Sequence, residues 1–291
     1  MVEKTVIVSD DIQKAAAALK NFRPAYAEML DFYEQLFLAQ EASKNQIDIA
    51  PIQISDEMLS LKTKEKFPLI DIADFVVDMK SAHKLFIDIC KTAKGTNERL
   101  AGSAQKILDA INGAFDSKTL FTSLLKGDDE KMAEAAKQLS VEKSVLACIT
   151  YSSLQPSLTV CAEQLSVYLD KKDLWQQGYC PICGSPPVLS MLAGEGERFL
   201  ICSFCWHKWP VKRVFCPFCK AFNNKTFHYF FSEEEKEYRV YMCDSCKKYM
   251  KTIDTRKAER TIYPPLEQVV TLHLDMKANE MGFQSDITHL I

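Results

Sequence analysis

The chain has 291 residues, a formal net charge of −3 and a hydrophobic fraction of 47%. This composition excludes an intrinsically disordered chain, and the length allows about two ordinary domains. Acidic residues interrupt the N-terminal apolar stretch, and no window approaches the roughly 20 apolar residues of a spanning helix. We therefore expect a soluble, cytoplasmic protein.

Residues 1–175 are predicted to form a helical domain. Acids after Ser9 can cap a first helix that runs through Leu19, and Pro24 interrupts it. Apolar side chains then recur at helical spacing from Tyr26 to Phe37. An apolar and aromatic stripe of this kind is typical of a helix that faces a core.

The rest of this region continues the helical pattern after one irregular connection. Ile47–Leu61 contains Pro51 and is predicted as a loop. A last helix is expected from Pro156 to Leu169, and others are predicted at 75–90, 97–111, 120–125, 130–139 and 141–151. Six or more helices with short polar connections predict a bundle-like domain.

Eight of the eleven cysteines form four Cys-x-x-Cys pairs in the second half of the chain. Two cysteines three residues apart on a tight turn can present both thiolates to one metal ion, so each pair supplies half of a tetrahedral site. The pairs are Cys180 and Cys183, Cys202 and Cys205, Cys216 and Cys219, and Cys243 and Cys246. We predict these eight cysteines as the ligands of two metal ions.

The gaps between the pairs favour a sequential arrangement. They contain 18, 10 and 23 residues, and the two longer gaps suit hairpins that return a second pair to the first. This predicts one site from Cys180, Cys183, Cys202 and Cys205, and another from Cys216, Cys219, Cys243 and Cys246. An interleaved pairing is also compatible with the gaps. Iron and zinc both accept four thiolates, so the sequence leaves the metal open.

The residues between the pairs alternate as strands do. Predicted strands at 188–191 and 198–201 flank a Gly-Glu-Gly turn, strands at 226–231 and 237–242 flank an acidic turn, and another strand includes 251–253. We predict an α+β protein in which a helical domain (1–175) precedes two tandem rubredoxin-like or zinc-ribbon modules (176–214 and 215–260). A C-terminal helix (261–291) follows, with an apolar face from Leu266 to Met276.

The remaining cysteines and the histidines have less specific interpretations. Cys90, Cys148 and Cys161 lie among apolar residues of predicted helices and are expected in the core. His207 follows the second pair and could replace a thiolate, but eight cysteines already complete two sites. His228 is predicted as a strand residue. His83, His273 and His289 have no partner pattern.

The charge distribution bears on nucleic-acid binding. Residues 176–260 hold 14 Lys and Arg against 9 Asp and Glu, whereas the regions before and after are acidic. A basic ribbon is a typical nucleic-acid footprint. However, each divalent ion with four thiolates carries a charge of −2, so two filled sites cancel most of the excess. Nucleic acid is therefore disfavoured as a partner.

The sequence shows no catalytic signature, such as a phosphate-binding loop or a nucleophile elbow. A metal with four thiolates has no open coordination position, which argues against metal-assisted hydrolysis. Two other hypotheses about the function are compatible with the sequence: a nucleic-acid-binding zinc-ribbon protein and a rubredoxin-like electron carrier. Redox disulfides or an extracellular disulfide framework would also use paired cysteines, but the intracellular character of the chain favours metal.

The order of these motifs resembles a known family, the FdhE-type formate dehydrogenase accessory proteins. The resemblance is carried by the four ordered cysteine pairs, by Arg23-Pro-Ala-Tyr26 near the start and by Glu280-x-Gly-Phe283 near the end. Residues around the pairs add to it: Pro181, Gly184, Trp209, Arg213, His228-Tyr229, Lys248-Tyr249, Lys251 and Leu272-x-Leu-Asp275. One departure is Lys247, where the family tends to have glycine after the last cysteine.

The resemblance implies a cytoplasmic maturation protein that is not an enzyme. Its implied partner is the catalytic subunit of a molybdenum or tungsten formate dehydrogenase, and its implied cofactors are two iron or zinc ions, each in a four-cysteine site of rubredoxin type. No membrane insertion is implied.

Overall fold

The structure is a computed structural model that describes residues 9–113, 115–170, 174–222 and 226–286. These residues form two compact units. The helical unit contains residues 9–50 and 73–160, and the sheet unit contains 51–72 and 161–286. The α+β class is confirmed, while the expected domain boundaries stay predictions. His289 and residues 1–8 lie outside the described residues.

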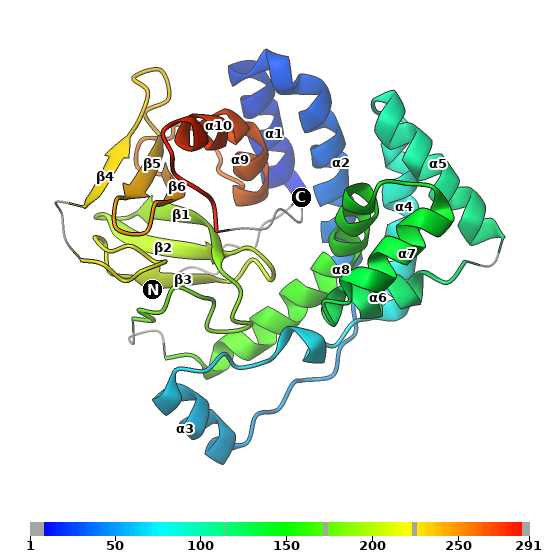
Figure 1. The fold of residues 1–291 in the computed structure, drawn as a ribbon, viewed down its shortest axis with the longest axis horizontal. Helices are drawn as coiled ribbons and strands as arrows, with labels where there is room; N and C mark the ends of the chain where they lie inside the picture. The colour runs from blue at the N-terminus through cyan, green and yellow to red at the C-terminus, as the bar shows by residue number, and fades with distance from the viewer. Residues whose placement is uncertain (1–8, 114, 171–173, 223–225, 287–291) are drawn as a thin grey trace. The chain divides into compact units, whose positions relative to one another are not determined.

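The helical unit follows the predicted helices closely. Pro24 ends α1 and begins the short η1, and aspartate or asparagine side chains cap α4, α5, α6 and α7 by accepting backbone N–H groups. Figure 1 shows the course of the chain. The elements are α1 (Ser9–Phe22), η1 (Pro24–Tyr26), α2 (Ala27–Lys44), α4 (Met79–Ala93), α5 (Glu98–Asn112), α6 (Ser117–Leu125), α7 (Asp129–Leu139) and α8 (Lys143–Leu165).

One prediction in this region is wrong. The expected break at Pro156 does not occur, because α8 continues through the proline. Proline lacks an N–H group, so the carbonyl of Ser152 loses its helical partner. The side-chain amide of Gln40 donates to that carbonyl at 2.7 Å inside the core. A residue far away in sequence thereby allows a proline in the middle of a helix.

The helix α8 also contradicts the expectation that no stretch of the chain approaches the apolar length of a membrane-spanning helix. Lys143–Tyr168, which includes η3 (Ser166–Tyr168), is long and apolar enough to cross a membrane by length and composition. However, 67% of its apolar window is buried inside the structure, and several of its hydroxyl groups bond to carbonyls one turn earlier. Those properties are typical of the core helix of a globular unit.

The sheet unit contains one six-stranded sheet in the order β3-β2-β1-β6-β5-β4 (Figure 1). Its first half is antiparallel, with β1 (Pro187–Ala193), β2 (Glu197–Cys202) and β3 (Lys208–Val211). Its second half repeats this order, with β4 (Phe227–Phe230), β5 (Tyr238–Cys243) and β6 (Lys248–Asp254). The predicted hairpins therefore form, each with a third strand.

The two halves are joined by a parallel pairing of β1 with β6. Ser190, Met191 and Leu192 lie opposite Thr252, Ile253 and Asp254. The two predicted modules are thus halves of a single sheet, which their separate cysteine patterns did not predict.

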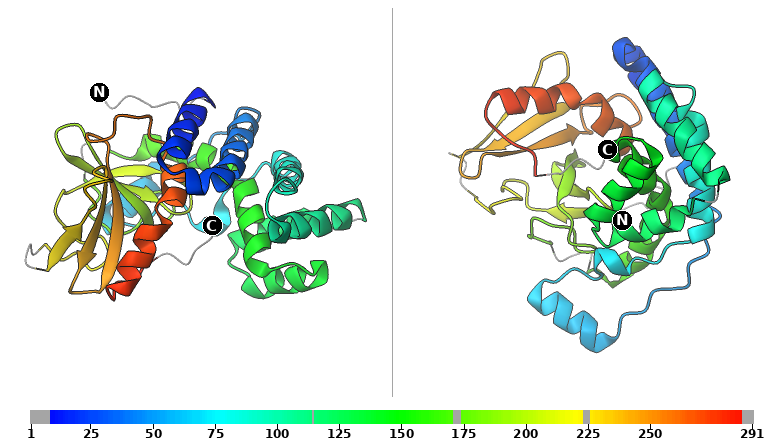
Figure 2. Two further views of the ribbon diagram at one scale, coloured as in Figure 1. Left: turned by 90° about the horizontal axis from the view of Figure 1, so that it is seen from above. Right: turned by 45° about the vertical axis from the view of Figure 1, so that its right-hand side comes forward.

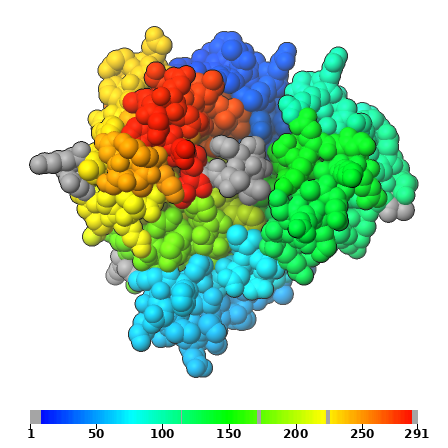
Figure 3. All heavy atoms as spheres, in the orientation of Figure 1, coloured from blue at the N-terminus to red at the C-terminus, as the bar shows by residue number. Residues whose placement is uncertain are grey.

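Three helices complete the sheet unit. The predicted C-terminal helix is divided at Thr271 into α9 (Pro264–Val270) and α10 (Leu272–Glu280), because the φ of −103° and ψ of 19° at Thr271 leave the helical range. The Thr271 hydroxyl donates to the Glu267 carbonyl at 2.7 Å. These helices lie along one face of the twisted sheet (Figure 2), and Figure 3 shows their atoms, in red, beside the yellow and orange second half of the sheet unit. The loop expected at 47–61 is wrong in part, because α3 (Asp56–Glu65) begins after the capping side chain of Ser55.

Candidate metal centres

The first cluster brings together Cys180, Cys183, Cys202 and Cys205. Their sulfur atoms lie within 4.8 Å of one another, and three of the separations are 3.4, 3.6 and 3.7 Å. The β1–β2 hairpin places them, because Pro187 lies opposite Cys202 in its register. A tetrahedral ion with metal–sulfur bonds of about 2.3 Å needs sulfur atoms about 3.8 Å apart. The observed spacing fits such an ion.

The second cluster has the same design. Cys216 and Cys219 precede β4, Cys243 ends β5, and Cys246 lies in the turn before β6. Two sulfur separations, from Cys216 to Cys246 and from Cys219 to Cys243, are both 3.6 Å. The structure thus groups the cysteines sequentially and not in the interleaved arrangement.

The knuckles, meaning the turns that carry the cysteine pairs, share a backbone conformation. In three of them the residue after the second cysteine donates its N–H to the carbonyl of the first: Gly184 to Cys180 at 2.9 Å, Lys220 to Cys216 at 2.9 Å, and Lys247 to Cys243 at 2.8 Å. In all four knuckles that residue has a positive φ: Gly184 (76°), Trp206 (58°), Lys220 (60°) and Lys247 (57°). Gly184 adopts this conformation without a side chain that opposes it.

Backbone amides in the knuckles point at the sulfur atoms. The N–H of Ile182 donates to the Cys180 sulfur at 3.4 Å, and the N–H groups of Phe204 and Cys205 donate to the Cys202 sulfur at 3.3 and 3.4 Å. Hydrogen bonds to a charged form favour that form, so these amides stabilise thiolates.

The electrostatics of the first cluster require a cation. Hydrogen bonds from the neighbouring thiols, Cys180 first, hold the pKa of Cys183 well below its usual value. Burial raises the pKa of Cys180 and of Cys205 well above it. Four thiols in contact in this buried site therefore cannot all ionise by themselves. A metal ion would supply the positive charge that four thiolates need.

The two clusters differ in exposure. All four cysteines of the first are buried, whereas in the second Cys219 is exposed and Cys246 is half-buried. A segment before α4 accounts for the burial of the first cluster, since the N–H groups of Leu69 and Ile70 donate to the carbonyls of Pro181 and Ile182 at 2.9 Å. That segment covers the first knuckle with backbone.

A glycine allows close approach to the third knuckle. A Cβ atom at Gly178 would lie 1.7 Å from the carbonyl oxygen of Pro217, which is impossible without moving the backbone. Gly178 therefore lets the chain before the first cluster pass directly against the second. This contact could not be predicted from the sequence, because a lone glycine in a loop carries no local signal for it.

The histidines lie outside both groups of four cysteines. His207 stacks on Trp209 with ring centroids 6.4 Å apart. His228 lies on β4, as predicted, with its Nδ1 atom 3.3 Å from a carboxylate oxygen of Asp244. His83 pairs with Ser117, and His273 pairs with Glu235. The second pairing involves a residue of the acidic turn between β4 and β5.

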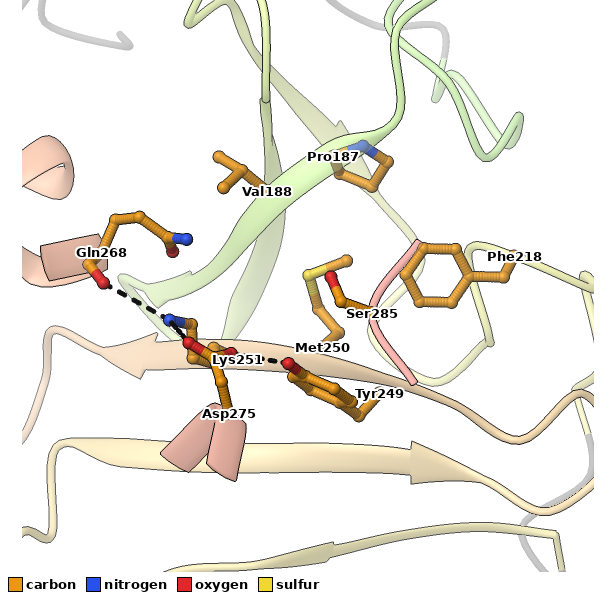
Figure 4. A pocket seen from close by; sticks show the side chains of 9 residues that line it. All are labelled: Pro187, Val188, Phe218, Tyr249, Met250, Lys251, Gln268, Asp275 and Ser285. Carbon is orange, nitrogen blue, oxygen red and sulfur yellow. Dashed lines mark hydrogen bonds and ion pairs between the residues drawn. The ribbon is translucent and has the colours of Figure 1, made fainter. Parts of the chain in front are cut away.

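Residues near the last cysteine form a buried polar anchor (Figure 4). The ammonium group of Lys251 lies 2.6 Å from one carboxylate oxygen of Asp275, and the hydroxyl of Tyr249 donates to the other at 2.7 Å. Lys251 also donates to the carbonyl of Gln268 at 3.4 Å. This anchor ties α9 and α10 to β6, beside a cavity of about 10 Å³ that suits a single water.

Comparisons with known proteins bear on the identity of this fold. The family model described as "FdhE, central domain" matches residues 179–213. A "Protein FdhE homolog" of Aquifex aeolicus is 32% identical over 165 residues, which cover 55% of this chain and 57% of the relative. The "Protein FdhE" of Escherichia coli O1:K1 / APEC is 32% identical over 111 residues, which cover 37% of this chain and 35% of that protein. The match thus spans just over half of the length of the first relative and about a third of the length of the second.

A solved structure covers more of the chain. The structure titled "The crystal structure of the FdhE protein from Pseudomonas aeruginosa" superposes with a TM-score of 0.67 and 19% identity, over 96% of this chain and 95% of that one. At this identity the likeness concerns the fold. It shows that this chain and that protein share a fold.

Proposed function

We propose that the chain is an FdhE-type protein, a cytoplasmic accessory protein that binds and matures the catalytic subunit of a formate dehydrogenase; its similarity to the FdhE central domain and to FdhE homologues supports this. The observation that carries the proposal is the pair of complete four-cysteine clusters in a fold shared with that family. It is not an enzyme in this proposal, since a metal held by four thiolates has no position for a substrate.

The proposal assigns the eight clustered cysteines as ligands of two iron or zinc ions. The sulfur spacing and the amides that point at sulfur support this assignment. The metals would hold the knuckles in place and would thereby shape the sheet unit for binding. A tetrathiolate ion adds negative charge but offers no Lewis-acid position.

Binding of another protein is supported by aromatic side chains at the edge of the sheet. On and after β4, Tyr229 is 46% exposed and Phe231 is 44% exposed, and the two rings lie 6.1 Å apart. Exposed aromatic residues are frequent anchors of protein interfaces. These side chains are candidates for contact with the partner.

The test is genetic and biochemical. In cells that depend on formate oxidation, deletion of the gene should leave the catalytic subunit present but inactive. A tagged copy of the full chain should restore activity and should capture that subunit, whereas Cys180→Ser and Cys243→Ser variants should do neither. Normal formate dehydrogenase activity in the deletion strain, with no paralogue present, would refute the proposal.

A further inference from the structure

Arg198 on β2 is a buried cation whose contacts are all uncharged. Its side chain is 1% exposed. The guanidinium group donates to the Ser190 hydroxyl at 2.9 Å and to the carbonyls of Phe215 and Arg213 at 2.8 and 3.5 Å. Its Nη2 atom is buried without a hydrogen-bond partner in the part of the chain that the structure describes. Serine and carbonyl oxygens solvate the group but do not neutralise it.

Aromatic rings surround the same guanidinium group. Its central carbon lies 5.8 Å from the ring centres of Phe215 and Phe227 and 5.5 Å from that of Tyr241. Such contacts attract the cation, but they replace only part of the hydration that an ion loses when it is taken out of water. Burial lowers the pKa of Arg198 to about 10, so the group stays charged at neutral pH. Among the described residues, the groups that accept hydrogen bonds from Arg198 are all uncharged.

The buried carboxylate of Asp254, in the same sheet, already pairs with two other arginines. Asp254 lies 3.0 Å from Arg239 and 2.7 Å from Arg256, and it is fully buried. A further guanidinium, that of Arg213, lies close to Arg256, since a Cβ at Gly196 would contact both. Positive charge therefore exceeds negative charge among these described side chains.

The contacts of Arg198 converge on the second cluster. Phe215, whose carbonyl Arg198 bonds, immediately precedes Cys216. Phe227 lies opposite Cys243 in the β4–β5 register, and Tyr241 is two residues before Cys243. A divalent ion bound by the four thiolates of the second cluster would carry a charge of −2, next to the residues that contact Arg198.

We infer that Arg198 is the internal counter-ion of the metal-loaded second cluster and thereby raises the metal affinity of that site. The inference rests on the proposed metal ligation by Cys216, Cys219, Cys243 and Cys246. With iron, the same charge favours the ferrous site, which carries −2, over the ferric site, which carries −1. Arg198 is thus a positioning residue that acts through charge and through the carbonyl before Cys216.

The test compares variants of the zinc-loaded full chain during titration with a coloured chelator. Arg198→Met removes the charge at similar side-chain length, and Arg198→Lys keeps the charge. The matched control is Arg256→Met, since Arg256 has a carboxylate partner. A Cys219→Ser variant identifies the release step of the second cluster. Arg198→Met should weaken zinc binding at that cluster at least tenfold and at the first cluster less than twofold, and Arg198→Lys should restore most of the loss.

A second readout uses the iron-loaded protein. Loss of the charge should lower the reduction potential of the second site, by about 59 mV for each tenfold change in the ferrous-to-ferric preference. If Arg198→Met does not fold, Arg198→Gln keeps a hydrogen-bond donor without the charge and is expected to show the same shift.

Three results separate the possible failures. Equal weakening of both clusters by Arg198→Met, or loss in Arg198→Lys as large as in Arg198→Met, would show a role in folding alone and would overturn the inference. Unchanged zinc affinity and potential in the neutral variants would overturn it as well. A wild-type protein that holds no metal in the second cluster would instead refute the metal ligation in the proposed function, and the inference with it.

Discussion

The residue after each second cysteine carries a conformation that its side chain disfavours. At Trp206, Lys220 and Lys247 the backbone has a φ between 57° and 60°, a region that glycine adopts freely and other residues adopt at a cost of about 1–2 kcal/mol. At Lys220 and Lys247 the N–H···O bond across the knuckle holds this turn in place. Only Gly184 fills the position without a steric penalty.

Replacement of Lys247 by glycine is therefore expected to stabilise the metal-loaded protein. The free energy of unfolding in urea should rise by about 0.5–1 kcal/mol, because the relief of strain outweighs the loss of an exposed ion pair with Asp244 and of a cation–π contact with Phe283. Lys248→Gly is the matched control, since Lys248 begins β6 and a glycine in a strand weakens it. A loss of stability in Lys247→Gly would contradict the idea that this turn is strained.

Metal content tests the ligand assignment at single residues. The purified protein is expected to hold about two ions per chain, and Cys180→Ser and Cys243→Ser should each lose about one, because each cysteine belongs to a different group of four. The measurement is elemental analysis after removal of loosely bound metal. Ser153→Ala, a hydroxyl of the helical unit, is the control. Loss of both ions in either cysteine variant would show that the two sites do not fill independently.

At the scale of elements, α8 depends on a contact between residues far apart in sequence. Gln40→Leu leaves the Ser152 carbonyl buried without a partner, and we expect the free energy of unfolding to fall by about 1–3 kcal/mol. In a Pro156→Ala background the loss should be smaller, since residue 156 then supplies a helical N–H. Urea unfolding of the four variants in a double-mutant cycle measures the coupling. Gln105→Leu, on the exposed side of α5, should change stability by less than about 0.5 kcal/mol.

The elements also show which parts of the structure the sequence could predict. Alternation and turn residues predicted the β1–β2 and β4–β5 hairpins, and the gaps between cysteines predicted their grouping, because these signals are local or nearly so. The parallel contact of β1 with β6 joins Ser190 to Thr252 and has no local signal. The continuity of α8 through Pro156 likewise depends on Gln40, and the burial of the first cluster depends on the backbone at Leu69. Such features follow from tertiary contacts between distant residues.

Arg198 illustrates the same limit within the candidate site. Arg198 lies on a predicted strand, and a charged residue on a strand normally faces solvent, so the sequence did not predict its burial. Its burial follows from the rings of Phe227 and Tyr241, which belong to the second half of the sheet. The charge balance of residues 176–260 could indicate that basic side chains neutralise the clusters, but it could not indicate which ones.

At the scale of the whole molecule, the shared sheet couples the two clusters while the helical unit keeps its own core. The strands of each half are short and depend on their knuckles, and small β-structures of this size lack enough buried area to fold without metal or other cross-links. The helical unit buries apolar side chains such as Phe86, Phe121 and Leu146, which lie far along the chain from the cysteine pairs. Removal of metal is therefore expected to affect the two units differently.

Chelation of the metal-loaded full chain should abolish protection from hydrogen exchange throughout β1–β6 while amides of α2 and α4 stay protected. The helical signal in circular dichroism should largely remain. Because Ser190, Met191 and Leu192 pair with β6, Cys180→Ser alone should also weaken protection at Thr252 and Ile253, which belong to the other half. Cys90→Ala, in the core of α4, is the control and should lower stability in the helical unit without this effect. A sheet that stays protected without metal would show that its apolar core suffices, and simultaneous loss of α2 and α4 would show that both units unfold as one.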